Sequence, residues 1–215
     1  LHAASMAQLR RYLAPGVQII ATMRDGLAVS DLAGYLTSQG FGASRMTVLE
    51  RAGGPLEKVT TTTAAALKGE FDHPVCAAIH VAGAGAALTV ATGQSDESFA
   101  NDGQITKRPI RAITLSTLAP KPHEHLWDIG GGSGSIALEW LLSHPTTTAT
   151  CIEPRADRVA RINQNARDLG VEKRMNVIEG AAPAALTDLG VPHAIFVGGG
   201  VCDAVLEAGR KRRHA

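Results

Sequence analysis

A glycine-rich stretch of the chain has the residue types of a ligand-binding loop. Its sequence is Asp128-Ile129-Gly130-Gly131-Gly132-Ser133-Gly134-Ser135, and it lies between a predicted strand and a predicted helix. Glycines permit tight turns and let a ligand approach the main chain closely. The free N–H groups at the start of the following helix offer hydrogen-bond donors and the positive end of a dipole. The stretch therefore predicts a small-molecule site at the end of a strand.

Three ligand classes use such loops, and similar turns also occur without any ligand. A phosphate-binding Walker loop ends in Lys followed by Ser or Thr, and this loop contains no Lys. A dinucleotide fingerprint can be drawn through Gly132, Gly134 and Ala137, although that pattern alone is weak. The alternating pattern Asp128-x-Gly130-x-Gly132-x-Gly134 resembles the first motif of class I S-adenosylmethionine (SAM) methyltransferases.

Two later turns bear on the choice between these ligands. Glu153 follows the next predicted strand, where a carboxylate can accept both hydroxyls of an adenosine ribose and disfavours a 2′-phosphate. Taken alone, such a glutamate is also typical of a charged helix entrance. Gly180 and Ala181 follow the third strand, and in the methyltransferases that the loop resembles, small residues at this turn admit the flat adenine ring. The three turns in this order favour SAM over a dinucleotide.

The elements that position these turns alternate between strand and helix. Strands are predicted at residues 126–129, 149–152, 175–178 and 194–197, and helices at 108–118, 135–142, 155–169 and 183–189, with a last helix from near Cys202. We expect the first helix to be buried along one face, formed by Ile110, Ile113, Leu115 and Leu118. The alternation predicts an α/β fold with a doubly wound, Rossmann-like parallel sheet. Because the basic end at 209–215 offers no further strand, we expect a C-terminally truncated sheet.

The first part of the chain has a separate pattern. Strands are predicted at residues 17–21, 45–49 and 75–81, with a helix at 27–38 and a short helix at 63–67. We expect the polar run Thr60 to Thr63 to cap that short helix and to face solvent. Small, polar and glycine residues from 83 to 101 are typical of a linker. We therefore predict a partial domain over 1–90, a linker over 91–101 and a second domain over 102–215.

Further motifs extend the likeness from a fold to one family. They are Phe99-x-x-Asp102-Gly103-Gln104-Ile105-Thr106-Lys107, Leu126-Trp127-Asp128-Ile129-Gly130, Glu179-Gly180-x-Ala182-Pro183 and Phe196-Val197-Gly198-Gly199-Gly200. Together they resemble the carbon-15 methylating and decarboxylating domain of the precorrin-6Y C(5,15)-methyltransferase family of cobalamin biosynthesis. In the first part, Gly40-Phe41-Gly42-x-Ser44-Arg45 and Gly53-Gly54-Pro55 resemble the C-terminal half of that family's carbon-5 methylating domain, which has a tetrapyrrole-methylase fold.

This resemblance implies a cofactor, a substrate and residues for each. The cofactor is SAM, and its expected binding residues are Thr106, Asp128, Gly130, Gly131, Gly132, Ser133, Gly134, Glu153, Gly180 and Ala181. The substrate is a precorrin, whose carboxylates pair with cations such as Lys107 and Arg108, while Gly198 and Gly199 leave room for the macrocycle. Lys107 and Arg108 are equally typical of a solvated helix start. No catalytic residue is identified, because an electron-rich ring carbon attacks the methyl group with little help from a base.

Composition argues against other classes of partner. A net charge of +1 and 4% aromatic residues disfavour nucleic acid. No apolar run is long enough to span a membrane. Three scattered cysteines fit a reducing compartment, so we expect a cytoplasmic protein. His123 and His125 lack a third ligand in sequence, so no metal site is predicted. Relatives suggest a homo-oligomer.

Two alternatives to an active methyltransferase stay open. The chain lacks the N-terminal half of the resembled carbon-5 domain and a strand beyond residue 200, which is also typical of a catalytically inactive remnant. An NAD-binding oxidoreductase is the other alternative, although the sequence offers no catalytic pair for hydride transfer.

Overall fold

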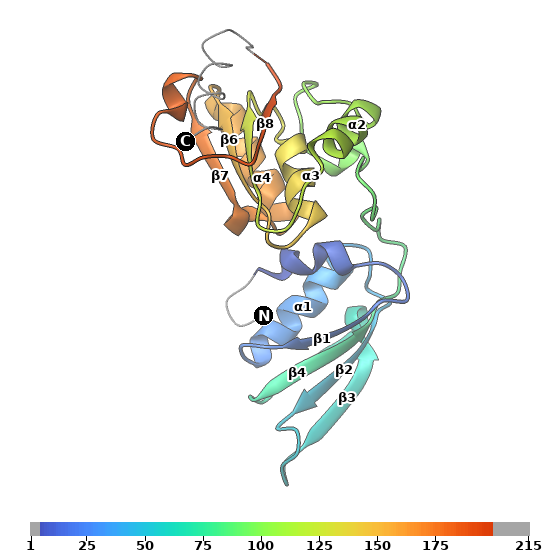
Figure 1. Cartoon of the computed structure of the whole chain (residues 1–215). Helices are drawn as coiled ribbons and strands as arrows, with labels where there is room; N and C mark the ends of the chain where they lie inside the picture. The colour runs from blue at the N-terminus through green and yellow to red at the C-terminus, as the bar shows by residue number, and fades with distance from the viewer. Residues whose placement is uncertain (1–4, 200–215) are drawn as a thin grey trace. The chain divides into compact units, whose positions relative to one another are not determined.

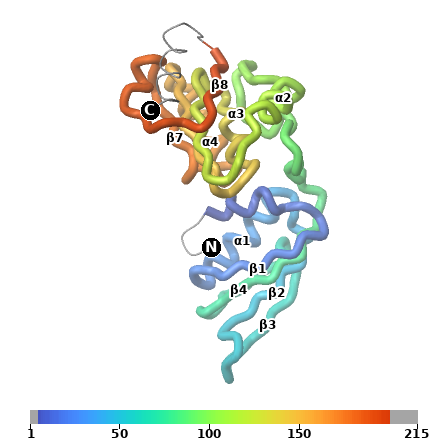
Figure 2. Tube along the Cα trace, viewed as in Figure 1, coloured from blue at the N-terminus to red at the C-terminus, as the bar shows by residue number. Residues whose placement is uncertain are grey.

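The computed structural model describes residues 5–199 and divides the chain after Leu88. Unit 1 runs to Leu88 and unit 2 begins at Thr89 (Figures 1 and 2). Each unit is considered by itself below. The helix expected from near Cys202, the basic end at 209–215 and Gly200 lie outside the described residues.

Unit 1 is built on an antiparallel sheet with the strand order β1-β4-β2-β3. Its elements in chain order are η1 (Met6–Tyr12), β1 (Gln18–Thr22), α1 (Gly26–Ser38), β2 (Arg45–Glu50), β3 (Lys58–Thr63), η2 (Ala64–Ala66) and β4 (Val75–His80). The three predicted strands and the longer helix are present within a residue or two of their expected bounds. α1 lies along the sheet (Figure 1).

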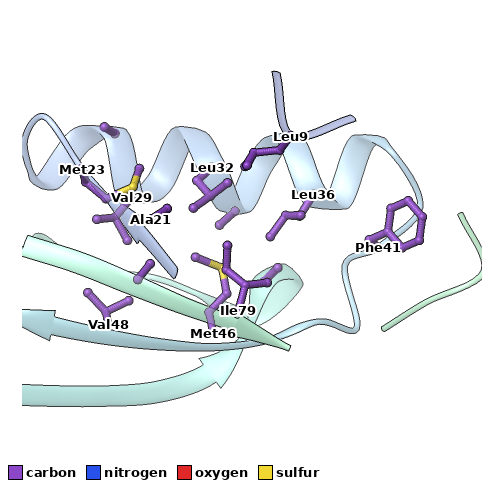
Figure 3. Packing of buried hydrophobic residues seen from close by; sticks show 14 of the residues in the cluster. Leu9, Ala21, Met23, Val29, Leu32, Leu36, Phe41, Met46, Val48 and Ile79 are labelled. Carbon is purple, nitrogen blue, oxygen red and sulfur yellow. The ribbon is translucent and has the colours of Figure 1, made fainter. Parts of the chain in front are cut away.

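The core of unit 1 is formed by buried residues that recur every second position on β2 and about once per turn on α1. Met46 and Val48 alternate with less buried residues along β2, as expected for a strand with one covered face. Leu32 and Leu36 lie one turn apart on α1 and face these strand residues (Figure 3). The helix begins where the Asp25 carboxylate accepts a hydrogen bond from the N–H of Ala28 at 2.8 Å.

The polar run Thr60 to Thr63 does not cap a helix. It belongs to β3, the edge strand, which pairs in register with β2 from Lys58 to Thr63. The side chains of β3 are exposed or half-buried, so the expected solvent contact is present. β-Branched residues favour an extended backbone, and this propensity outweighed the capping tendency of threonine.

Unit 2 holds four parallel strands in the order β7-β6-β5-β8. Its main elements are α2 (Arg108–Leu118), β5 (His125–Ile129), α3 (Ser135–Ser143), β6 (Thr148–Glu153), α4 (Ala156–Asp168), β7 (Met175–Glu179) and β8 (Ala194–Val197). All four predicted strands are present, and the α/β fold with a parallel sheet is confirmed. β6 and β8 flank β5 on opposite sides, which creates a topological switch point at the carboxyl end of β5.

Two helix predictions in unit 2 were wrong in part. Ile110 and Ile113 on α2 are 58% and 64% exposed, whereas Arg111 is fully buried beside Leu115. Apolar periodicity predicted the wrong buried face of α2. The Arg111 side chain is buried because it bonds to carboxylate and carbonyl oxygens inside the unit. The helix expected at 183–189 is reduced to a short 3-10 helix, η5 (Ala184–Leu186), within a turn.

The segment expected to be a linker packs into unit 2. We call residues 93–107 the strap; it contains the short η3 (Asp96–Ser98), is otherwise irregular, and leads into α2 (Figure 2). Gly93 and Gln94 donate their backbone N–H groups to the buried Glu139 carboxylate at 2.6 and 2.9 Å. Phe99 is also buried. An irregular backbone can be packed in this way because side chains satisfy its polar groups.

We expect Leu36→Ala to lower the free energy of unfolding of unit 1 by about 2–5 kcal/mol, because it leaves a cavity in a closed core. Leu36 is fully buried, whereas Leu27, on the same helix, is 67% exposed. Leu27→Ala is therefore the matched control, with an expected change within about 0.5 kcal/mol. Urea unfolding followed by circular dichroism measures both. Equal effects of the two changes would contradict the core as described.

Candidate functional site

A cavity of about 500 Å³ opens at the carboxyl ends of the four parallel strands in unit 2. The expected site residues that line it are Thr106, Gly130, Gly131, Gly132, Ser133, Glu153, Gly180, Ala181, Gly198 and Gly199. Asp128, Gly134, Lys107 and Arg108 are not among its lining residues. The fold thus brings together the turns after all four strands, at the place where open α/β sheets bind ligands.

The glycine loop after β5 uses its glycines for two different reasons. Gly130, Gly132 and Gly134 have φ values of 76°, 59° and 76°, in the left-handed region that favours glycine. Gly131 instead makes a close approach, since a Cβ atom there would lie 2.0 Å from the sulfur of Cys151 on β6. Each glycine of the motif is therefore required by backbone conformation or by contact.

Glu153 at the end of β6 is buried and held in a fixed orientation. Its Oε2 accepts a hydrogen bond from the N–H of Gly132 at 2.8 Å, and its Oε1 accepts one from the N–H of Arg155 at 3.1 Å. A carboxylate has about four acceptor sites, so two bonds leave capacity for further donors. The residue thus offers an oriented pair of acceptors at the cavity wall.

Asp128 on β5 bonds to the first turn of α3, the helix that follows the glycine loop. Its Oδ2 accepts a hydrogen bond from the N–H of Ala137 in the first turn of α3 at 3.2 Å, and its Oδ1 has no hydrogen-bond partner among residues 5–199. Burial raises the pKa of Asp128 to about 7; the bond from Ala137 opposes this rise, and the charge of Glu153 adds to it. At pH 7, therefore, about half of the Asp128 carboxyl groups are protonated and uncharged.

The cavity also contains an unpartnered hydroxyl. Ser133 is 2% exposed and lines the cavity, and its Oγ has no hydrogen-bond partner in the described part of the chain. Buried polar groups are normally satisfied, so an unsatisfied one at a cavity wall marks a place where a polar ligand atom gains a hydrogen bond.

Residues 104–106 of the strap line the cavity beside the glycine loop, and sequence reasoning missed what holds the strap in place. Arg111 on α2 donates to Glu139 on α3, to Asp96, and to the carbonyl oxygens of Gln94 and Thr106. Its guanidinium carbon also lies 4.8 Å from the centre of the Phe99 ring, a cation–π contact. One sequence signal was available: Glu139 is the charged residue of an otherwise apolar helix, and a buried charge requires a partner.

The cations near the cavity differ from those expected. The Lys107 side chain is 68% exposed, with Nζ 3.8 Å from Asp96, and Arg108 is exposed as well. Arg158 on α4 lines the cavity instead, and its Nε donates to Asp102 at 2.9 Å. This hydrogen bond is the main cause of a pKa of about 2 for Asp102. Arg155 and Arg161 also lie 3.8 and 3.4 Å from the Asp102 carboxylate. The spacing of these three arginines, three residues apart at and after the start of α4, was the sequence signal for this cluster.

Comparison with known proteins decides the family. A family model described as a precorrin methyltransferase domain matches residues 97–215. The chain belongs to the precorrin methyltransferase family. The resemblance inferred from the motifs is thereby confirmed.

Relatives in this family are similar over nearly the whole chain. A precorrin-6Y C(5,15)-methyltransferase [decarboxylating] from Sinorhizobium sp is 50% identical over 97% of this chain and 51% of its own length. One from Mycobacterium tuberculosis is 41% identical over 86% of this chain and 47% of its own length. The chain therefore spans about half the length of these curated relatives.

Solved structures agree with the parallel sheet of a precorrin methyltransferase. The C-terminal domain of precorrin-6Y C5,15-methyltransferase from Rhodobacter capsulatus is 48% identical, with a TM-score of 0.56 over 58% of this chain and 66% of that one. A precorrin-6Y C5,15-methyltransferase from Geobacter metallireducens is 31% identical, with a TM-score of 0.54 over 59% of this chain and 67% of that one. The likeness supports the Rossmann-like class I methyltransferase fold.

Residues 5–199 hold neither a metal-binding cluster nor a membrane-spanning helix. Within that range, no three His, Cys, Asp or Glu residues are arranged to hold a metal ion. His125 contacts Thr148, Thr150 and His193 instead. No helix in the described range has the length and apolar character to cross a bilayer.

We expect Gly131→Ala to lower the free energy of unfolding by about 1–3 kcal/mol, because the added Cβ overlaps the Cys151 sulfur. Adding Cys151→Ala removes that sulfur and should restore most of the loss. Gly190→Ala is the control, since nothing lies within 4 Å of its Cβ position. Urea unfolding measures all three. A loss in Gly131→Ala that the second change fails to relieve would argue against this contact.

We expect the stability of the ligand-free protein to carry a pH-dependent cost from Asp128. Its folded pKa of about 7 lies above the ordinary aspartate value of 3.8, so its contribution to stability is most favourable below about pH 4 and is lost as the pH rises through about 7. Asp128→Asn removes this loss. The stability of Asp128→Asn relative to wild type should therefore increase by roughly 3 kcal/mol between pH 4 and pH 8.

Urea unfolding at several pH values measures this difference, with circular dichroism at each pH to show that both proteins are folded. A difference that stays constant with pH would contradict the raised pKa of Asp128.

Proposed function

We propose that this chain is part of a SAM-dependent C-methyltransferase that acts on a precorrin in cobalamin biosynthesis. The observation that carries the proposal is the joining of the glycine loop and the buried Glu153 in one cavity at the switch point of the sheet. Membership of the precorrin methyltransferase family supports the reaction class. The activity over carbons 5 and 15, with loss of an acetate carboxyl group, is the full reaction that we propose for the complete protein.

The residues of the cavity fit the parts of SAM. Glu153 offers oriented acceptors for the two ribose hydroxyls. The main chain at residues 130–133 and the unpartnered Ser133 hydroxyl suit the methionine end, which carries a carboxylate. Gly180 and Ala181 leave a flat space for adenine, and Thr106 contributes from the strap. When bound, SAM supplies an electrophilic methyl group on a positively charged sulfur.

The chain's own part in such a reaction is to align the two reactants and to exclude water. Gly198 and Gly199 follow β8 beside the glycine loop; a Cβ on Gly198 would lie 2.9 Å from the Gly130 carbonyl oxygen, whereas one on Gly199 would meet nothing within 4 Å. Small residues here leave room for a large, flat substrate next to the cofactor. The exposed cations Lys107 and Arg108, which directly follow the cavity residue Thr106, are proposed to meet substrate carboxylates.

We also propose a domain identity for each unit and a cellular location for the protein. We propose that unit 1 is part of the carbon-5 methylating domain and unit 2 most of the carbon-15 methylating domain. A cytoplasmic location is supported by the free Cys76 and Cys151. A homo-oligomer, and the absence of a nucleic-acid partner, stay predictions.

We expect the chain to bind S-adenosylhomocysteine with micromolar affinity, about −8 kcal/mol, and Glu153→Gln to weaken this binding tenfold or more. The substitution keeps the size of the side chain but removes the negative charge and one acceptor oxygen. Glu124→Gln is the control, because Glu124 precedes β5 at the amino end of the strand and does not line the cavity. Titration calorimetry on the folded variants measures the affinities.

The wild-type chain and Glu153→Gln together test the proposal. Unchanged affinity in Glu153→Gln would exclude Glu153 as the ribose ligand. A wild-type chain that is folded but does not bind S-adenosylhomocysteine would overturn the proposed cofactor site.

A further inference from the structure

Asn165 on α4 is a buried polar residue that joins two walls of the cavity. It is 2% exposed, and its amide makes three hydrogen bonds to main-chain groups far away in sequence. Its Nδ2 donates to the carbonyl oxygens of Ala100 at 2.9 Å and Ser133 at 3.0 Å, and its Oδ1 accepts from the N–H of Ala100 at 2.9 Å. Ala100 belongs to the strap and Ser133 to the glycine loop.

These two segments approach each other closely at the cavity. The carbonyl oxygen of Gln104 in the strap lies 3.5 Å from the position that a Cβ on Gly132 would take. Residues 104–106 and 130–133 all line the cavity. A change in the spacing between strap and loop would therefore alter the cavity directly.

A primary amide suits this position better than other side chains of its size. The site requires two donors and one acceptor in one plane, which asparagine supplies. An ionised aspartate could accept from Ala100 but would set a negative charge against two carbonyl oxygens. An apolar residue would remove the partner of three main-chain groups, of which the Ser133 carbonyl oxygen makes a fully buried bond.

We propose that Asn165 is a positioning residue that holds the strap and the glycine loop at the spacing the cofactor requires. The inference rests on the proposed function, because it assigns the cavity to an adenosyl ligand. Asn165 acts through Ser133 and Ala100 and does not itself line the cavity.

The test compares Asn165→Asp with Asn163→Asp, the same chemical change two positions earlier on α4. The Asn163 amide bonds to the carbonyl oxygen of Val159 in its own helix and joins no second segment. Titration calorimetry with S-adenosylhomocysteine at pH 8 should show affinity at least tenfold weaker for Asn165→Asp and within about twofold of wild type for Asn163→Asp.

A pH series separates positioning from a loss of stability alone. Burial raises the pKa of a carboxyl group, so Asp at position 165 should become protonated as the pH is lowered and regain one donor. The affinity of Asn165→Asp relative to wild type should therefore recover between pH 8 and pH 5.5. A variant that is less stable but binds equally well at every pH would overturn the inference.

A measurement on the wild-type protein covers the case in which Asn165→Asp does not fold. Hydrogen exchange with and without S-adenosylhomocysteine should show slower exchange at the N–H of Ala100 together with that of Gly132. Slower exchange at Gly132 alone would overturn the coupling while leaving the proposed function intact. If the folded wild type does not bind S-adenosylhomocysteine, the proposed function fails, and the inference fails with it.

Discussion

The Glu153 carboxylate accepts hydrogen bonds from the N–H groups of Gly132 and Arg155, and it thereby ties the turn after β5 to the turn after β6. The tie requires the glycine loop to pass directly over β6. Glycine at position 131 permits this, because a Cβ there would overlap the sulfur of Cys151. A buried carboxylate requires hydrogen-bond donors. The Gly132 N–H can reach Glu153 only because the neighbouring residue 131 has no side chain. The shape of the cavity depends on both conditions.

The strap is held by side chains rather than by a strand or a helix. Arg111, Glu139 and Asn165 come from three helices, are all buried, and bond to its main chain. Burying an ion pair costs desolvation, and apolar residues often stabilise a core equally well. The hydrogen bonds give direction, however, which apolar contacts do not. An irregular segment at a cavity wall can thus be held in one conformation.

Two buried polar side chains, one at the end of β5 and one in the glycine loop, have incomplete hydrogen bonding within residues 5–199. Asp128 has a buried carboxyl oxygen without a partner, and the Ser133 hydroxyl has none either. Such groups lower the stability of the ligand-free fold, and at Ser133, which lines the cavity, a polar ligand atom would compensate for this cost. The raised pKa of Asp128 is part of the same cost. In unit 1, apolar packing between α1 and the sheet forms the core (Figure 3).

The sequence by itself determined the elements whose signals are local. Alternation of strand and helix predicted the parallel sheet, and the glycine loop with Glu153 predicted a small-molecule site at the carboxyl ends of its strands, where the structure has a cavity. Tertiary structure alone decided the burial of Arg111, the packing of the strap and the role of β3 as an edge strand. Hydrophobic periodicity registers apolar burial only. A charged or amide side chain becomes buried when partners distant in sequence converge on it, and the fold brings those partners together.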